Sequence, residues 1–237
     1  MLEGILSGKT RVLDLAYAIN DRLVPWPGDK RWFEAETNAS VEKDGFFTRS
    51  FWMLEHYGTH LDAPIHFPPG KTPLDQIPVK QLFGPAVVLD VRKEGAANID
   101  YRLSAERVDE WEKQHGPIPE GAIVLLRTSW SSRWPDLKTY RSQDHFGRMH
   151  FPGFSVEAVE KLIERKVSGI GCDTMSVDCG VALDFPVHHL ALGAGLYHLE
   201  NLSDLSELPE KGAFLVVAPI KLEGGSGGPV RVFALLP

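Results

Sequence analysis

The chain has 237 residues, of which 43% are hydrophobic and 24% are charged. This balance excludes a disordered, collagen-like or coiled-coil chain and allows a substantial core. The 32 acidic residues outnumber the 25 basic ones, the net charge is −7, and no basic stripe is visible, so we expect no nucleic-acid partner. No apolar run approaches the ~20 residues that a membrane span needs, and we expect no membrane partner.

The opening segment and the cysteines suggest a compartment. Residues 1–14 lack the basic start, apolar stretch and small-residue cleavage site of a signal peptide. Cys172 and Cys179 form neither a disulfide framework nor a C-x-x-C motif, so we expect buried thiols in a reducing compartment. The sequence therefore predicts a cytoplasmic protein.

No repeat and no long polar linker divides residues 1–237, so we expect a single domain. Short runs rich in β-branched and aliphatic residues between turn signals predict strands. These runs are 12–19, 46–54, 86–91, 122–127, 167–172, 213–220 and 230–235.

Three helices are expected. The first follows Ser104 and stops near residues 116–117, and the second follows Ser155 with apolar residues on one face. A third, shorter helix starts at Pro186 and ends near residues 193–195. Because strands outnumber helices and do not alternate strictly with them, a mixed α/β architecture fits better than a doubly wound parallel sheet.

Two segments are predicted as irregular. Residues 129–154 form a long aromatic and polar stretch, which we interpret as a loop that is functional or simply mobile. The glycine-rich residues 224–229 are expected to form a flexible turn between two strands.

The segment 55–66 carries the chemistry. His56, His60, Asp62 and His66 fall at i, i+4, i+6 and i+10. Neutral imidazole and carboxylate are ordinary ligands of zinc and manganese. A straight strand would separate His56 from His60 by ~13 Å at ~3.3 Å per residue, too far for one ion. We therefore expect a bent strand or strand-to-loop segment, with the bends at Gly58 and Pro64. This segment would hold a metal on His56, His60 and Asp62.

A second segment supplies more candidate ligands. His188 and His189 are adjacent and lead into the short helix, and the sequence leaves open which of them binds. Glu200 follows that helix in an otherwise apolar, strand-like stretch, which is unusual for a free carboxylate. A metal or a charged partner would explain it; a carboxylate at a strand end in water is the alternative.

With these residues together, the chain resembles the cyclase family of metal-dependent hydrolases, which includes bacterial kynurenine formamidases and isatin hydrolases. The family signature has the form H-x-G-T-H-x-D-x-P-x-H, and residues 56–66 match it without departure. Residues 26–29, 169–174, 184–188 and 199–202 resemble other family segments, so the resemblance covers nearly the whole chain.

The resemblance implies a fold, a reaction and roles for residues. The fold is a mixed, strand-rich α/β barrel-like domain with a few flanking helices, usually dimeric or tetrameric with active sites near subunit contacts. One or two zinc or manganese ions per subunit would be bound, the first by His56, His60 and Asp62, the second by the shared Asp62 with His188 and Glu200. Formamidase-like members hold two ions, whereas some isatin-hydrolase-like members hold one manganese and have an amide where Glu200 stands, so Glu200 favours two ions. His66 would be the catalytic histidine.

The implied reaction is hydrolysis of an amide-type C–N bond by metal-activated water, with His66 carrying the proton. The expected substrate is a small aromatic molecule, an aryl formamide such as N-formylkynurenine; isatin, another cyclic imide or a lactone is the alternative. Trp26 and Phe46 are predicted to stack on it, and Phe47, Trp130 and Trp134 are further candidates.

Three competing interpretations remain weaker. A non-catalytic metal-binding protein would have the ligands but would not need His66. A structural zinc site is usually closed and often uses cysteine, whereas His/His/Asp leaves open positions. Residues 224–228 formally fit G-x-S-x-G, but a strand follows them instead of the helix that a nucleophile elbow requires.

Overall fold

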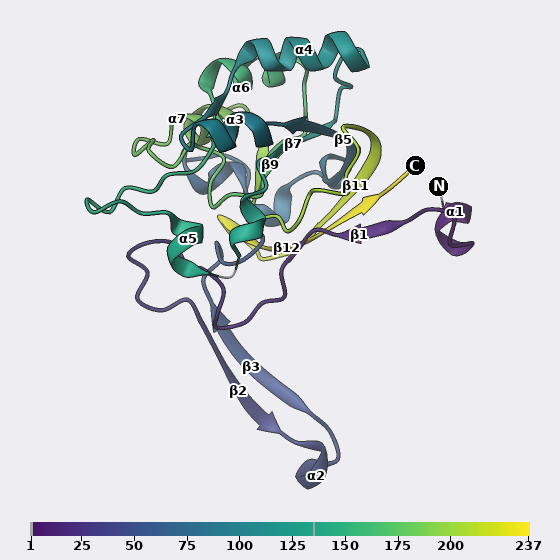
Figure 1. The fold of residues 1–237 in the computed structure, drawn as a ribbon. Helices are drawn as coiled ribbons and strands as arrows, with labels where there is room; N and C mark the ends of the chain where they lie inside the picture. The colour runs from purple at the N-terminus through teal and green to yellow at the C-terminus, as the bar shows by residue number, and fades with distance from the viewer. Residues whose placement is uncertain (1, 135) are drawn as a thin grey trace.

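Seven strands of an eight-stranded sheet close into a barrel (Figure 1). The computed structural model describes residues 2–134 and 136–237. The order around the barrel is β12-β11-β5-β7-β9-β10-β4, and β4 pairs again with β12. These strands are β4 (His60–Asp62), β5 (Phe83–Asp90), β7 (Ile123–Arg127), β9 (Gly169–Cys172), β10 (Tyr197–Glu200), β11 (Lys211–Pro219) and β12 (Gly227–Leu235). The predicted barrel-like mixed α/β fold is confirmed.

Strand direction explains how the barrel closes. β5, β7, β9 and β10 run parallel, whereas β11, β12 and β4 join antiparallel. The start of β12 pairs with β4, and its end pairs on the same edge with β1 (Val12–Asp14). The predicted turn 224–229 is therefore wrong in its second half, because Gly227, Gly228 and Pro229 belong to β12 and form the closure.

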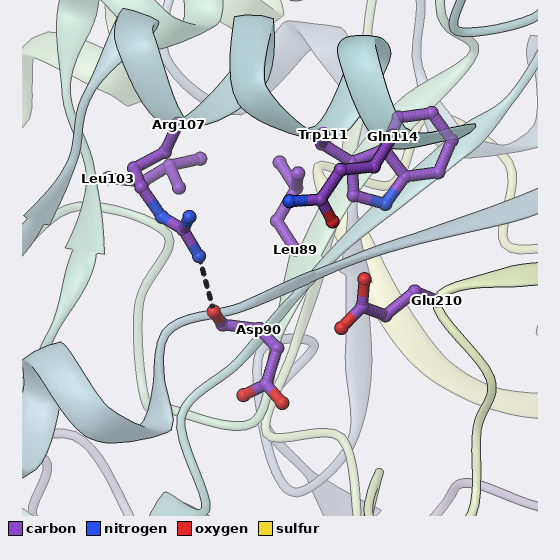
Figure 2. A pocket seen from close by; sticks show the side chains of 7 residues that line it. All are labelled: Leu89, Asp90, Leu103, Arg107, Trp111, Gln114 and Glu210. Atoms are coloured by element: carbon purple, nitrogen blue, oxygen red, sulfur yellow. Dashed lines mark hydrogen bonds between the residues drawn. The ribbon is translucent and has the colours of Figure 1, made fainter. Parts of the chain in front are cut away.

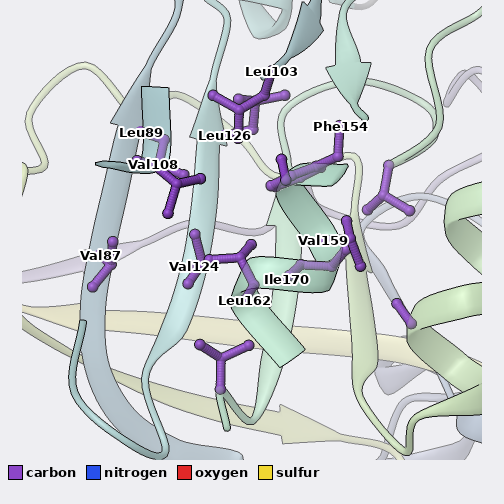
Figure 3. Packing of buried hydrophobic residues seen from close by; sticks show 14 of the residues in the cluster. Val87, Leu89, Leu103, Val108, Val124, Leu126, Phe154, Val159, Leu162 and Ile170 are labelled. Carbon is purple, nitrogen blue, oxygen red and sulfur yellow. The ribbon is translucent and has the colours of Figure 1, made fainter. Parts of the chain in front are cut away.

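Alternating side chains divide the core between the inside and the outside of the barrel. Val88, Leu125 and Leu199 belong to the interior cluster. The residues next to them in sequence, such as Val87 and Leu126, belong to a second cluster, which the helices cover (Figure 3). Side chains on β4 and β10 that flank interior leucines therefore face the outer, helix-covered side.

Three helices cover this outer side as predicted: α4 (Ala105–His115), α6 (Val156–Glu164) and α7 (Pro186–Gly193). The Ser155 side chain accepts a hydrogen bond from the backbone N–H of Ala158 and caps α6, whose buried face includes Val159 and Leu162. The remaining elements are short: α1 (Leu2–Leu6), α3 (Arg92–Ala97), α5 (Leu137–Arg141), β6 (Arg102–Leu103), β8 (Gly153–Phe154), and 3-10 helices at Pro64–His66, Leu74–Gln76, Val79–Leu82 and Trp130–Arg133.

A two-stranded arm extends from the barrel (Figure 1). It consists of β2 (Phe33–Ala39), α2 (Val41–Asp44) and β3 (Thr48–Met53). β3 confirms the predicted strand 46–54 in shortened form, but it pairs only with β2 and contributes nothing to the barrel.

The segment 129–154 departs from the predicted loop. Its described residues include two short helices and β8, and Trp130, Tyr140 and Phe151 are buried in a third apolar cluster with Val24. Burying these aromatic side chains outweighs the polar composition that suggested a loop. The predicted strand 12–19 is also shorter, since only β1 forms.

The lengths of the helices and one small pocket complete the description of the fold. Within residues 2–134 and 136–237, no helix has the length and apolar character to cross a bilayer. A pocket of only about 100 Å³ lies between β5 and α4, and Arg107 and Glu210 are among the side chains that line it (Figure 2).

Candidate metal centre

The motif segment bends where the sequence predicts. Gly58 has a φ of +69°, a conformation that glycine adopts without strain, and Pro64 begins a 3-10 helix. The bend brings His56, which precedes β4, back to the strand: its Nδ1 lies 2.6 Å from Oδ1 of Asp62. His60 and Asp62 share the outer face of β4 because Leu61 between them points into the barrel.

The second group of ligands arrives from β10 and α7. Glu200 pairs with His60, and His198 pairs with Asp62, in the antiparallel register of β10 against β4. His188, in the first turn of α7, is 4% exposed and joins this cluster. His189 is exposed on the same helix, so the structure places His188 in the site and leaves His189 outside the cluster.

Hydrogen bonds orient the imidazoles toward the centre. His60 Nδ1 donates to the carbonyl of Gly58 at 3.0 Å, and His188 Nδ1 donates to Asp178 at 2.6 Å. In both rings this leaves Nε2 facing the carboxylates, as the nitrogen that would bind an ion. His56 Nε2 lies 2.9 Å from the Ser226 hydroxyl, which leaves Nδ1 facing Asp62. Such a second hydrogen bond is how proteins fix a metal-binding tautomer.

Donor separations fit two adjacent ions. His60 Nε2 lies 3.2 Å from Asp62 Oδ1, beside His56 Nδ1. On the other side, His188 Nε2 lies 3.4 Å from both Asp62 Oδ2 and Glu200 Oε1. Two donors at about 2.1 Å from one tetrahedral ion stand about 3.4 Å apart. The two oxygens of Asp62 therefore face different donor groups, as a shared carboxylate would.

The charges of the cluster favour a cation. Burial and, after it, the negative charge of Asp62 raise the pKa of Glu200 to about 7, against the opposing charges of His188 and His60. Burial alone would lower the pKa of His60, but the charge of Asp62 raises it to about 9. For His188, burial is likewise outweighed, here by hydrogen bonds to Asp178 and Asp62, and the pKa rises to about 10. Two carboxylates in a buried site thus attract positive charge, which a divalent ion would supply.

A cavity of about 490 Å³ opens onto this cluster and has the size of a small-molecule site. Trp26, one predicted substrate-binding residue, lines it. Phe46, the other, lies on the arm with 57% of its surface exposed and does not line the pocket of its own chain. Neither Trp130 nor Trp134 lines it, because both pack in the third apolar cluster. Apolar residues of the wall are Val24, Trp26, Leu54, Phe67, Met175 and Phe185.

His66 lies at the edge of the cluster. Its ring stacks on His56 with centroids 3.9 Å apart, and it lines the cavity. Burial lowers the pKa of His66 to about 4; the charge of Asp62 opposes this shift, and the neighbouring imidazoles act in the same direction as burial. The ring is therefore neutral near pH 7 and can accept a proton.

Residues 13–179 match the Cyclase family model, described as "Putative cyclase". The chain belongs to the cyclase family. An isatin hydrolase of Roseibium aggregatum is 36% identical over 98% of this chain and 94% of its own length. A kynurenine formamidase of Salinibacter ruber is 29% identical over 93% of this chain and 95% of its own length.

Solved structures agree with this assignment. Isatin hydrolase A from Ralstonia solanacearum superposes with a TM-score of 0.91 at 36% identity, over all of this chain and 95% of its own. An isatin hydrolase bound to a product analogue, thioisatinate, gives a TM-score of 0.92 at 33% identity, over 99% of this chain and 95% of its own. This cyclase-family chain is an amide-cleaving hydrolase.

Several site residues escaped the sequence analysis. His198 was given no role, although its position two residues before Glu200 in one strand-like stretch predicts the same face. Asp178 gave no signal, since only folding brings its carboxylate to His188. Ser226 sits in the glycine-rich segment that suggested a turn, and its hydroxyl donates to Glu55 at 2.7 Å.

Proposed function

We propose that this cyclase-family hydrolase opens the amide bond of a small aromatic substrate, with the ring amide of isatin as the first candidate. The observation that carries the proposal is that His56 Nδ1 and His60 Nε2 both face Asp62 Oδ1, at 2.6 and 3.2 Å, beside the neutral His66 in the lining of one cavity. The similarity to isatin hydrolases over the full chain supports the substrate class.

The donor set fits one or two divalent ions, zinc or manganese, held by His56, His60 and Asp62 and by Asp62, His188 and Glu200. When bound, such an ion activates water and polarises the substrate carbonyl. Imidazole and carboxylate suit both metals, and the donor separations near 3.4 Å suit the tetrahedral preference of zinc.

The side chains of this protein do the rest of the chemistry. His66 accepts the proton of the attacking water and returns it to the leaving nitrogen, because its ring is neutral near pH 7 and borders the cavity. Trp26, Phe67 and Phe185 offer aromatic faces to an aryl ring.

An aryl formamide such as N-formylkynurenine is the second candidate. Glu200 favours it, because a carboxylate at this position provides a full donor set for a second ion, the arrangement that the family resemblance associates with formamidases. Both substrates present an aryl amide carbonyl, so one machinery serves either.

The test is a substrate panel on metal-stripped protein reloaded with zinc or with manganese. We expect isatin to be hydrolysed with the higher kcat/KM, N-formylkynurenine more slowly, and both rates to follow metal content. A His60→Ala variant should lose metal and activity together. Substrate turnover that does not change when a chelator removes the metal would contradict the mechanism. Metal binding without turnover of any substrate in the panel would favour a non-catalytic metal-binding protein.

We also propose a homodimer or homotetramer in a reducing, cytoplasmic environment. The arm supports the first part, since it presents Phe46, Phe47 and Phe51 to solvent although it is only a two-stranded ribbon. The thiols of Cys172 and Cys179, both buried and free, support the second.

A further inference from the structure

His198 is fully buried on β10, yet neither nitrogen of its ring has a hydrogen-bond partner among the described residues. Buried imidazoles in folded proteins are almost always hydrogen-bonded, because an orphaned polar atom costs about 1–3 kcal/mol. The ring of His198 contacts that of His188 edge-on, with centroids 4.7 Å apart. Ring packing, and no hydrogen bond among the described residues, therefore holds the imidazole of His198 in the cluster.

A second orphaned atom faces it. Oδ2 of Asp62 is also buried without a hydrogen-bond partner in the described chain, and it lies 3.6 Å from Nδ1 of His198. That separation is too long for a hydrogen bond. It is close to the spacing of about 3.4 Å between two donors of one tetrahedral ion. The same Oδ2 stands 3.4 Å from His188 Nε2.

We infer that Nδ1 of His198 is a fourth metal donor, beside Asp62, His188 and Glu200. This inference rests on the proposed metal-dependent hydrolysis and extends its ligand set by one residue. The four donor atoms lie within 4.8 Å of one another, and all four residues are buried. Binding an ion would satisfy the two orphaned atoms that face each other, Asp62 Oδ2 and His198 Nδ1.

The extra donor gives the two subsites different roles. Four protein donors complete a tetrahedral shell, which is typical of a closed site. In the neighbouring group, His56, His60 and Asp62 supply three donors, and with the nearby His66 acting as the base a position is kept for water or substrate. The closed subsite therefore holds the shared Asp62 in place, and the open subsite, next to His66, is where the reaction occurs.

The test compares three substitutions at this position in the full chain. The amide oxygen of His198→Asn lies near the place of Nδ1, whereas that of His198→Gln reaches the place of Nε2. His198→Leu fills the space without a donor. Each metal-free protein is titrated with cobalt, followed by visible absorption, and with zinc against a competing chelator. Circular dichroism of the metal-free forms checks the fold.

We expect the wild type to bind two ions, one with the strong visible absorption of tetrahedral cobalt. His198→Gln and His198→Leu should weaken the binding of one ion by more than about a hundredfold, beyond the 10–100-fold that an outer partner costs. They should also lose the tetrahedral absorption, and His198→Asn should retain part of both. A smaller loss, or an unchanged cobalt spectrum, would overturn the inference.

A measurement on the wild type covers the case in which the variants do not fold. Protein with isotope-labelled histidine is loaded with a spin-active cadmium isotope. We expect a one-bond coupling between cadmium and Nδ1 of His198, and its absence at full loading would refute the assignment. A wild type that binds no metal would instead contradict the proposed function itself.

Discussion

Of His60, His66 and His188, which all line the cavity, only His66 has a lowered pKa. Burial lowers its pKa to about 4, whereas His60 and His188 are raised to about 9 and about 10 by the carboxylates around them. A lowered pKa means that the ring is neutral above pH ~5 and becomes charged only as the pH falls through about 4. Of these three imidazoles, His66 is thus the one that stands ready to accept a proton near pH 7.

Replacing His66 separates catalysis from metal binding. We expect His66→Ala to lower kcat by about 10²–10⁴-fold, the usual contribution of general acid–base catalysis, while the metal content stays at the wild-type level. Elemental analysis and steady-state kinetics on the same sample measure both. His145→Ala, an exposed histidine outside the cluster, is the control. A loss of metal in His66→Ala would identify this residue as a ligand instead of a base.

The raised pKa values of His60 and His188 predict proton release on metal loading. Both rings are protonated near pH 7.5 in the metal-free protein because their pKa values lie at about 9 and about 10. An ion needs the lone pairs, so loading should release about two protons, and the release should disappear above pH 10. Calorimetry in two buffers of different protonation enthalpy measures the number, and no release at pH 7.5 would contradict this electrostatic account.

At the same scale, local spacing decided which ligands the sequence could predict. His56, His60 and Asp62 lie within seven residues, and the bend at Gly58 was foreseeable from its freedom to adopt a positive φ. His198 looks like any buried histidine in an apolar strand, and its meaning depends on the register with β4. That register is a property of the closed barrel, which local spacing does not contain.

At the scale of elements, the closure between β12 and β4 holds His56 in place. A Cβ at Gly227 would lie 2.4 Å from Cε1 of His56 and 2.6 Å from the backbone oxygen of Leu61. Real side chains essentially never approach so closely, so either the ring or the strand pair must move. The contact between β12 and β4 at Gly227 is therefore closely packed, and this part of the glycine-rich segment is not a loose turn.

The close contact between β12 and β4 predicts the effect of adding one methyl group at residue 227. Gly227→Ala should lower the free energy of unfolding by about 1–3 kcal/mol, as overpacking does, and should weaken the binding of the ion that His56 helps to hold. Gly193→Ala in α7 is the matched control, since a Cβ there meets nothing within 4 Å. Denaturant unfolding and chelator competition measure the two effects. Equal stability and equal metal binding in the two variants would show that the contact between β12 and β4 tolerates a side chain at residue 227.

Elements with a periodic apolar face were predictable, and the others were not. α4 and α6 start directly after Ser104 and Ser155, as predicted, although only the Ser155 side chain makes a capping hydrogen bond. β2 was missed because its residues are mostly exposed, so no alternation toward a core marks it. Residues 129–154 were predicted as a loop because their buried aromatics pack against distant segments such as Val24.

At the scale of the whole molecule, the arm is the part that the barrel does not explain. An isolated two-stranded ribbon is marginally stable in water, and this one exposes 64% of Phe51 and 57% of Phe46. A groove of about 210 Å³ along its face is lined by apolar residues including Phe33 and Met53. A second copy of the chain covering the arm, as in the proposed dimer or tetramer, would bury these apolar side chains.

Removing the aromatic side chains of the arm should therefore dissociate the assembly. Each buried side chain of this size contributes about 1.5–3 kcal/mol, so Phe46→Ser/Phe51→Ser should raise the dissociation constant at least about a hundredfold. Light scattering after gel filtration should show a dimer or tetramer for the wild type and a monomer for this variant, with the barrel still folded by circular dichroism. Val79→Ser/Phe146→Ser, which changes exposed apolar residues away from the arm, should remain assembled. If both double variants keep the wild-type mass, the arm is not the interface.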